Sequence, residues 1–103
     1  MNTVNVFLAE KINGEWKFNE TTISSIDDIK EVIAQEPDEA YINDEVVAFY
    51  TVKASGIDAK VKDMNETRHY MSSPILVVRH NDVEPIDIND SVIQNIKETI
   101  DFC

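Results

Sequence analysis

The N-terminal twenty residues alternate between apolar and polar positions and predict a β-hairpin that turns at Asn13-Gly14. Asn-Gly between two alternating segments is the strongest short-range hairpin signal. We expect a three-residue loop with Gly14 in a left-handed bulge, because this register gathers the large apolar side chains on one face. These side chains are Val4, Val6, Leu8, Trp16 and Phe18. A two-residue turn, the alternative, would place the first three on the opposite face from the last two.

Two later segments have the apolar spacing of amphipathic helices. The first is predicted to begin at Ile26 after the N-cap Ser25, and Pro37 is expected to end it. The second is predicted to begin after an N-cap at Asn89 or Asp90. The side chains expected to face the core are Ile26, Ile29, Val32 and Ile33 in the first helix, and Val92, Ile93, Ile96 and Ile100 in the second.

Between the helices, three segments are predicted to be strands. Residues 45–54 are almost continuously apolar and rich in β-branched and aromatic side chains, which is typical of a central strand. Residues 59–62 alternate like a half-exposed strand, and residues 75–79 form another buried one. Residues 63–73 have no clear period and predict a loop or an irregular hairpin end. Residues 83–88 predict a connection or a short edge strand.

The elements follow one another in the order ββαββ(β)α. A chain of 103 residues with 43% hydrophobic residues is expected to form a single domain over residues 1–103. We predict an α+β fold, with an antiparallel sheet of about four to five strands and both helices packed on one face. One layer of helices is the simplest cover for an apolar sheet face in so short a chain.

The sequence contains no motif for catalysis or metal binding. Gly14 and Gly56 are too far apart to form a phosphate-binding loop, and the chain lacks the paired ligands of a zinc site. We interpret His69 and His80 as surface or turn residues and Cys103 as a packing residue or an incidental thiol. The expectation is therefore a protein that is not an enzyme and needs no cofactor and no metal.

The compartment is inferred from the cysteine content and the apolar runs. A single cysteine excludes an intrachain disulfide and favours a reducing environment. The N-terminus lacks a basic region followed by a long apolar stretch, and no apolar run is long enough to span a bilayer. We expect a cytoplasmic protein that does not contact membranes.

The strongest signal is a net charge of −11, from 20 acidic residues against 9 Lys and Arg. The acids are concentrated in residues 20–45, which contain nine of them against Lys30 alone, and in residues 82–103, which contain six against Lys97. Residues 46–81 instead contain more bases than acids. If both helices pack on the same side of the sheet, their outer faces form one acidic surface.

We expect this acidic surface to bind a basic, nucleic-acid-handling protein. The predicted contact residues are Asp27, Asp28, Glu31, Glu36, Asp38, Glu39, Asp44 and Glu45, together with Arg68 and Tyr70 in the predicted loop. Arg68 could satisfy an acidic group on the partner, and Tyr70 is an adaptable contact residue. Direct binding of nucleic acid is not expected, because acids interrupt the short basic stretch at residues 60–69. Formation of a homodimer through the edge of the sheet is an alternative that the sequence does not decide.

In size, acidity and lack of catalytic residues, the chain resembles the small inhibitors that phages make against host nucleases and defence systems. It is similar in the same respects to the acidic immunity proteins that neutralise nuclease toxins. The resemblance rests on composition and assigns no role to any residue. It implies an inhibitor that mimics nucleic acid or masks a nuclease. The alternative is a structural or assembly accessory protein whose acidity serves solubility.

Overall fold

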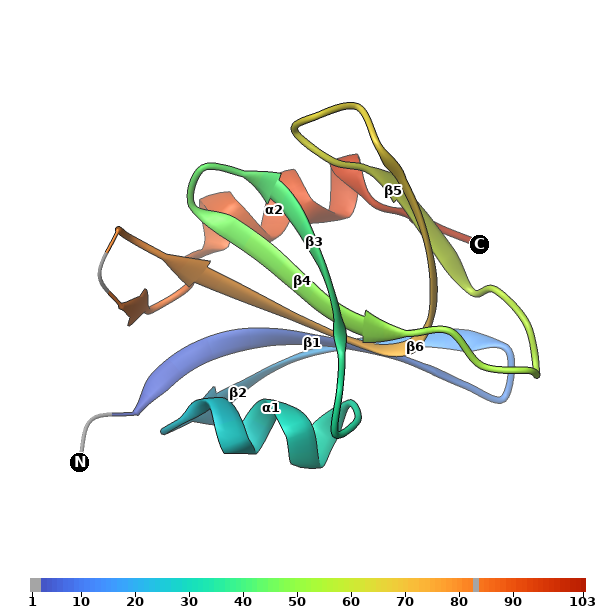
Figure 1. Ribbon diagram of the computed structural model, residues 1–103, viewed down its shortest axis with the longest axis horizontal. Coiled ribbons are helices and arrows are strands. Elements are labelled where there is room, and N and C mark those ends of the chain that lie inside the picture. The colour runs from blue at the N-terminus through green and yellow to red at the C-terminus, as the bar shows by residue number, and fades with distance from the viewer. Residues whose placement is uncertain (1–2, 83) are drawn as a thin grey trace.

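The computed structural model describes residues 3–82 and 84–103 and shows an antiparallel sheet with one helix on each side (Figure 1). The strands are β1 (Val4–Ile12), β2 (Glu15–Ile23), β3 (Asp38–Asn43), β4 (Val46–Thr51), β5 (Ala59–Lys62), β6 (Arg68–His80), β7 (Pro85–Ile86) and β8 (Asp101–Phe102). The helices are α1 (Ile26–Val32) and α2 (Asp90–Thr99). The predicted α+β class is confirmed, and the described residues form a sheet of eight strands rather than four to five.

The 13-residue strand β6 organises the sheet. The main path has the order β2-β1-β6-β4-β3, and β6 also pairs with β5 at its start and with β7 at its end. β8 extends the sheet beyond β5. The strands predicted at residues 45–54, 59–62 and 75–79 are confirmed as β4, β5 and the second half of β6.

The two helices lie on opposite faces of the sheet. Successive strand residues point to opposite sides, so Leu76 packs in one cluster with Ile29 of α1, whereas its neighbour Val77 packs in the other with Ile96 of α2. The prediction that both helices cover one face is therefore wrong. The physical reason lies in β4 and β6, whose runs of consecutive apolar residues make both faces of the sheet hydrophobic. Each face needs its own helix.

The β1–β2 hairpin has a two-residue turn, so the predicted three-residue loop is wrong. Ala9 pairs with Phe18, and both turn residues have positive φ, 54° at Asn13 and 82° at Gly14, as a type I′ turn requires. The large apolar side chains of the hairpin need not share one face, because both faces of the sheet are covered. Phe18 stacks on Phe7, with 5.7 Å between ring centroids, on the side of the sheet that α2 covers.

The turn conformation predicts the effect of replacing Gly14. A Cβ at this position would meet no other atom within 4 Å, so the cost is that of the left-handed backbone alone. We expect Gly14→Ala to lower the free energy of unfolding by about 1–2 kcal/mol, measured by urea titration. The control Asn13→Gly should not destabilise the fold. Equal stability of Gly14→Ala and wild type would contradict the type I′ assignment.

Helix α1 begins where the sequence predicts but ends early. It ends at Val32, five residues before Pro37, which therefore does not stop it. Ile29 and Ile33 are buried as predicted, whereas Val32 is 38% exposed. The side chain of Ile26 lies outside the described part of the structure.

Helix α2 begins as predicted, and β3 is an unpredicted strand. The side chain of Asn89 accepts a hydrogen bond from the backbone N–H of Val92 at 2.9 Å, which confirms Asn89 as the N-cap. Residues 63–73 are predicted to be a loop or an irregular hairpin end; residues 63–67 form the turn of the β5–β6 hairpin, and the rest belong to β6. Within residues 83–88, β7 confirms the short strand, and Val83 itself lies outside the description. No described helix is long and apolar enough to cross a membrane.

Candidate functional site

The first group of predicted contact residues lies on α1. Asp27 and Glu31 are exposed, four residues apart on the helix. Asp28 has a local role, because its Oδ2 accepts hydrogen bonds from the backbone N–H of Ser24 at 2.6 Å and from the Ser24 hydroxyl at 3.0 Å. These bonds, the backbone one foremost, lower the pKa of Asp28 below its ordinary value. The Asp28 carboxylate is therefore stabilised in its charged form.

The acidic stretch continues along the chain onto the edge strand β3. Glu36 is exposed in the connection after α1, and Asp38 and Glu39 are exposed at the start of β3. The Tyr41 hydroxyl donates a hydrogen bond to Glu39 Oε2 at 3.1 Å, and this bond raises the pKa of Tyr41. We call Asp27, Asp28, Glu31, Glu36, Asp38 and Glu39 the α1 acidic surface.

Asp44 and Glu45 belong to a different part of the molecule. They form the β3–β4 turn, about 20 Å along the strand from Asp38. Glu45 Oε2 lies 3.5 Å from Arg79 Nε, and both turn acids line a hollow of about 420 Å³ with His80. In the described ranges, no group of three or more His, Cys, Asp or Glu side chains is arranged to hold a metal ion. The structure thus separates these two residues from the α1 acidic surface.

The acids on α2 lie on the opposite side of the sheet from α1, whereas Glu84, just before β7, lines a hollow with Ile29 of α1. Asp90 and Glu98 are exposed on α2, which covers the other face (Figure 1). The prediction of one acidic surface formed jointly by both helices is therefore wrong, for the same reason that the one-layer fold is wrong. Acidic residues are exposed on both helical sides of the molecule.

Arg68 and Tyr70 are strand residues rather than loop residues. Both are exposed on β6, where Arg68 pairs with Lys62 and Tyr70 pairs with Lys60 of β5. The four side chains line a hollow of about 320 Å³, which we call the basic hollow. No described side chain of α1 lines it, so the predicted contact residues do not form one continuous site.

A hydrogen-bonded chain of Tyr50, His69 and Asp63 was missed by the sequence interpretation. The Tyr50 hydroxyl lies 2.7 Å from His69 Nδ1, and His69 Nε2 lies 2.7 Å from Asp63 Oδ2. His69 is half-buried, not a surface residue as predicted. The only sequence signal is the six-residue spacing from Asp63 to His69, which becomes informative once a tight turn between them is known.

The environment of this chain of side chains indicates a structural role. Burial raises the pKa of Tyr50, which is 6% exposed, and the hydrogen bond from His69 lowers the pKa of Asp63. The other oxygen of Asp63 accepts hydrogen bonds from the backbone N–H groups of Asn65 and Thr67. Both ring nitrogens of His69 are already engaged, so neither is free to act on a ligand. The network ties the β5–β6 turn to β4.

The lowered pKa of Asp63 predicts a pH-dependent contribution to stability. The contribution is present above the carboxyl's unfolded pKa, near 3.9, and is lost as pH falls through the lower folded value. We expect Asp63→Asn to destabilise the protein at pH 7 and to match wild type more closely at pH 3, measured by urea unfolding. Asp44→Asn, at an exposed turn, is the control and should have little effect. A destabilisation of the same size at both pH values would exclude the charge of Asp63 as its source.

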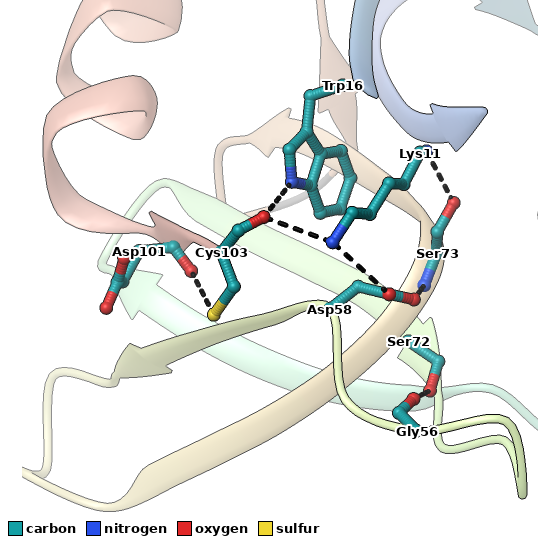
Figure 2. Close-up of polar contacts among 8 residues, drawn as sticks. All are labelled: Lys11, Trp16, Gly56, Asp58, Ser72, Ser73, Asp101 and Cys103. Atoms are coloured by element: carbon teal, nitrogen blue, oxygen red, sulfur yellow. Dashed lines mark hydrogen bonds and ion pairs between the residues drawn. The ribbon is translucent and has the colours of Figure 1, made fainter. Parts of the chain in front are cut away.

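The last residues of the chain are held by a second polar network, shown in Figure 2. The backbone oxygen of Cys103 accepts hydrogen bonds from Trp16 Nε1 at 3.1 Å and from Lys11 Nζ at 3.2 Å. Lys11 Nζ also lies 3.9 Å from Asp58 Oδ1. Phe102 packs edge-on against Trp16, with 4.8 Å between ring centroids. These contacts fasten β8 to the β1–β2 hairpin, and the exposed Cys103 thiol donates none of them.

Comparison with protein-family models, curated proteins and solved structures finds no match for this chain.

Proposed function

We propose that the protein is a non-enzymatic binding protein that inhibits a basic, nucleic-acid-handling protein through the α1 acidic surface. One observation carries the proposal. From α1 to the start of β3, five of six carboxylates are exposed, and none of the six lies within 4.0 Å of a Lys, Arg or His nitrogen in the described residues. Their charge is therefore available to a partner.

Carboxylates that lack a cationic partner and lie on a helix and a strand support recognition of a basic protein. They create a negative potential that speeds the approach of a basic partner and suppresses acidic ones. Carboxylate oxygens resemble phosphate oxygens in charge and in hydrogen-bond acceptance. A partner that uses Lys and Arg to hold nucleic acid can therefore bind these carboxylates with the same side chains, and inhibition follows from competition.

A second candidate is a structural or assembly accessory protein whose acidity serves solubility. The observation that favours it is the spread of acids over both helical sides, including Asp90 and Glu98 on α2. Net charge far from zero keeps a small protein soluble without any specific partner. This candidate predicts that the position of the acids is unimportant and only their number matters.

A pull-down of the full chain from a host extract, at low and high salt, separates the two candidates. We expect one basic nucleic-acid-binding protein to be captured at about 50 mM salt and released at about 500 mM, because salt screens exposed charges. Addition of this protein to the purified partner should then inhibit the partner's action on nucleic acid. Capture that does not depend on salt, or a captured protein that is not basic, would contradict the proposal.

A further inference from the structure

The basic hollow contains a pair of like charges that the protein itself does not compensate. Lys62 and Arg68 lie directly opposite each other on β5 and β6, an arrangement that destabilises a sheet. Within residues 3–82 and 84–103, neither cation has an acidic oxygen within 4.0 Å. The chain has only 9 Lys and Arg, and three of them meet here in an otherwise acidic molecule. A bound anion would relieve this repulsion.

The neighbouring pair supplies an aromatic ring. Tyr70 is 47% exposed, and its ring takes part in none of the aromatic contacts of the described residues. Lys60, opposite Tyr70, is 3.7 Å from Asp101 Oδ2, so its charge is partly balanced. The hollow of about 320 Å³ has the size of a small-ligand site. The anionic group of a ligand is therefore expected at Lys62 and Arg68, and an aromatic group of the same ligand at Tyr70.

We propose that the basic hollow binds a free nucleotide. The phosphate lies between Lys62 and Arg68, where the guanidinium can hold two phosphate oxygens at once. The base stacks on Tyr70, about 7 Å along the strand from Arg68. Neither contact uses a residue of the α1 acidic surface, so this inference does not depend on the proposed function.

The charge of the whole protein favours a free nucleotide over a nucleic-acid strand. Charges more than about 8 Å away are largely screened at physiological salt, so a small ligand inside the hollow interacts mainly with the local cations. A longer polyanion would extend past the hollow, first to Asp101 at its rim and then over a surface with a net charge of −11. Repulsion then outweighs the few cation contacts.

Titration calorimetry with ADP, adenosine, inorganic phosphate and a twelve-nucleotide single strand, at about 150 mM salt, tests the proposal. We expect ADP to bind one to one, and adenosine, phosphate and the oligonucleotide to bind more weakly. Arg68→Gln and Tyr70→Ala should each weaken ADP binding roughly tenfold or more. Tyr70→Phe should retain it, since the ring is kept. Lys17→Gln, an exposed lysine on β2, is the matched control and should bind ADP like wild type.

Three results would overturn the proposal. The first is no ADP binding at millimolar concentration, and the second is ADP binding that Arg68→Gln and Tyr70→Ala leave unchanged. The third is tighter binding of the oligonucleotide than of ADP, which would identify a nucleic-acid contact instead. The substituted side chains are exposed, so circular dichroism of each variant should match wild type.

Discussion

Replacement of Asp27, Glu31, Asp38 and Glu39 by lysine is expected to abolish binding of the basic partner while the fold is retained. All four side chains are exposed, and exposed substitutions usually change stability by about 0.5 kcal/mol or less each. The binding effect is larger because each change removes an attraction and adds a repulsion. Like charges brought together at an interface cost several kcal/mol. Affinity for the purified partner and urea unfolding of the variant measure the two effects.

A second four-lysine variant provides the matched control. It carries the same change in net charge on exposed acids outside the α1 acidic surface, at Glu15, Glu20, Asp82 and Glu98. We expect this variant still to bind the partner. Its association rate should be slower, because the negative electrostatic field of the whole protein is weaker. Equal loss of affinity in both variants would show that net charge alone acts, as the accessory-protein alternative predicts.

Replacement of one large buried side chain on either face of the sheet by alanine is expected to give the largest losses of stability. Leu76 and Ile96 are fully buried, one on the α1 side of the sheet and one in α2 on the other side. Each change to alanine should cost roughly 2–5 kcal/mol, from lost burial and the cavity left behind. That is a large part of the 5–15 kcal/mol typical of a small protein.

Urea unfolding of both alanine variants tests whether both faces of the sheet need their helix. Val32→Ala, at a half-exposed position on α1, is the control and should cost less than about 1 kcal/mol. A large loss for Leu76→Ala with no loss for Ile96→Ala would mean that α2 contributes little to the core, contrary to the two-sided packing.

Local signals in the sequence were sufficient to locate most elements. Asn13-Gly14 located the first turn, Asn89 the start of α2, and the apolar runs of β4 and β6 the centre of the sheet. The predicted hairpin register and helix layers are wrong because the sheet has two buried faces rather than one. The unbroken run of apolar side chains at residues 46–50 is the sequence signal that both faces of the sheet are buried.

The missed features depend on contacts between distant segments. β3 is an edge strand in which only Ala40 and Ile42 are buried, so its sequence gives a weak alternation signal. The structural role of His69 depends on its hydrogen bond with Tyr50, which lies 19 positions away on another strand. A side-chain network of this kind depends on strand pairing that the sequence does not reveal.

The candidate site was predicted in its charge but not in its placement. The acids of residues 20–45 are dense in the sequence, but β3 separates Asp44 and Glu45, in its turn to β4, from α1. Arg68 and Tyr70 are predicted as contacts on a loop, whereas the structure places them beside Lys60 and Lys62 on a strand pair. Charge along a sequence therefore indicates how acidic a segment is, and the fold decides which acids share a surface.

The most direct test of the central claim is a competition for the captured partner between nucleic acid and this protein. The partner is first bound to labelled nucleic acid, and the label is followed by fluorescence anisotropy while the protein is added. At a fixed salt concentration of about 100 mM, we predict displacement by wild type and none by the variant with lysine at Asp27, Glu31, Asp38 and Glu39. A ternary complex with the nucleic acid still bound, or displacement by that variant equal to wild type, would contradict the claim that the α1 acidic surface inhibits by occupying the partner's nucleic-acid site.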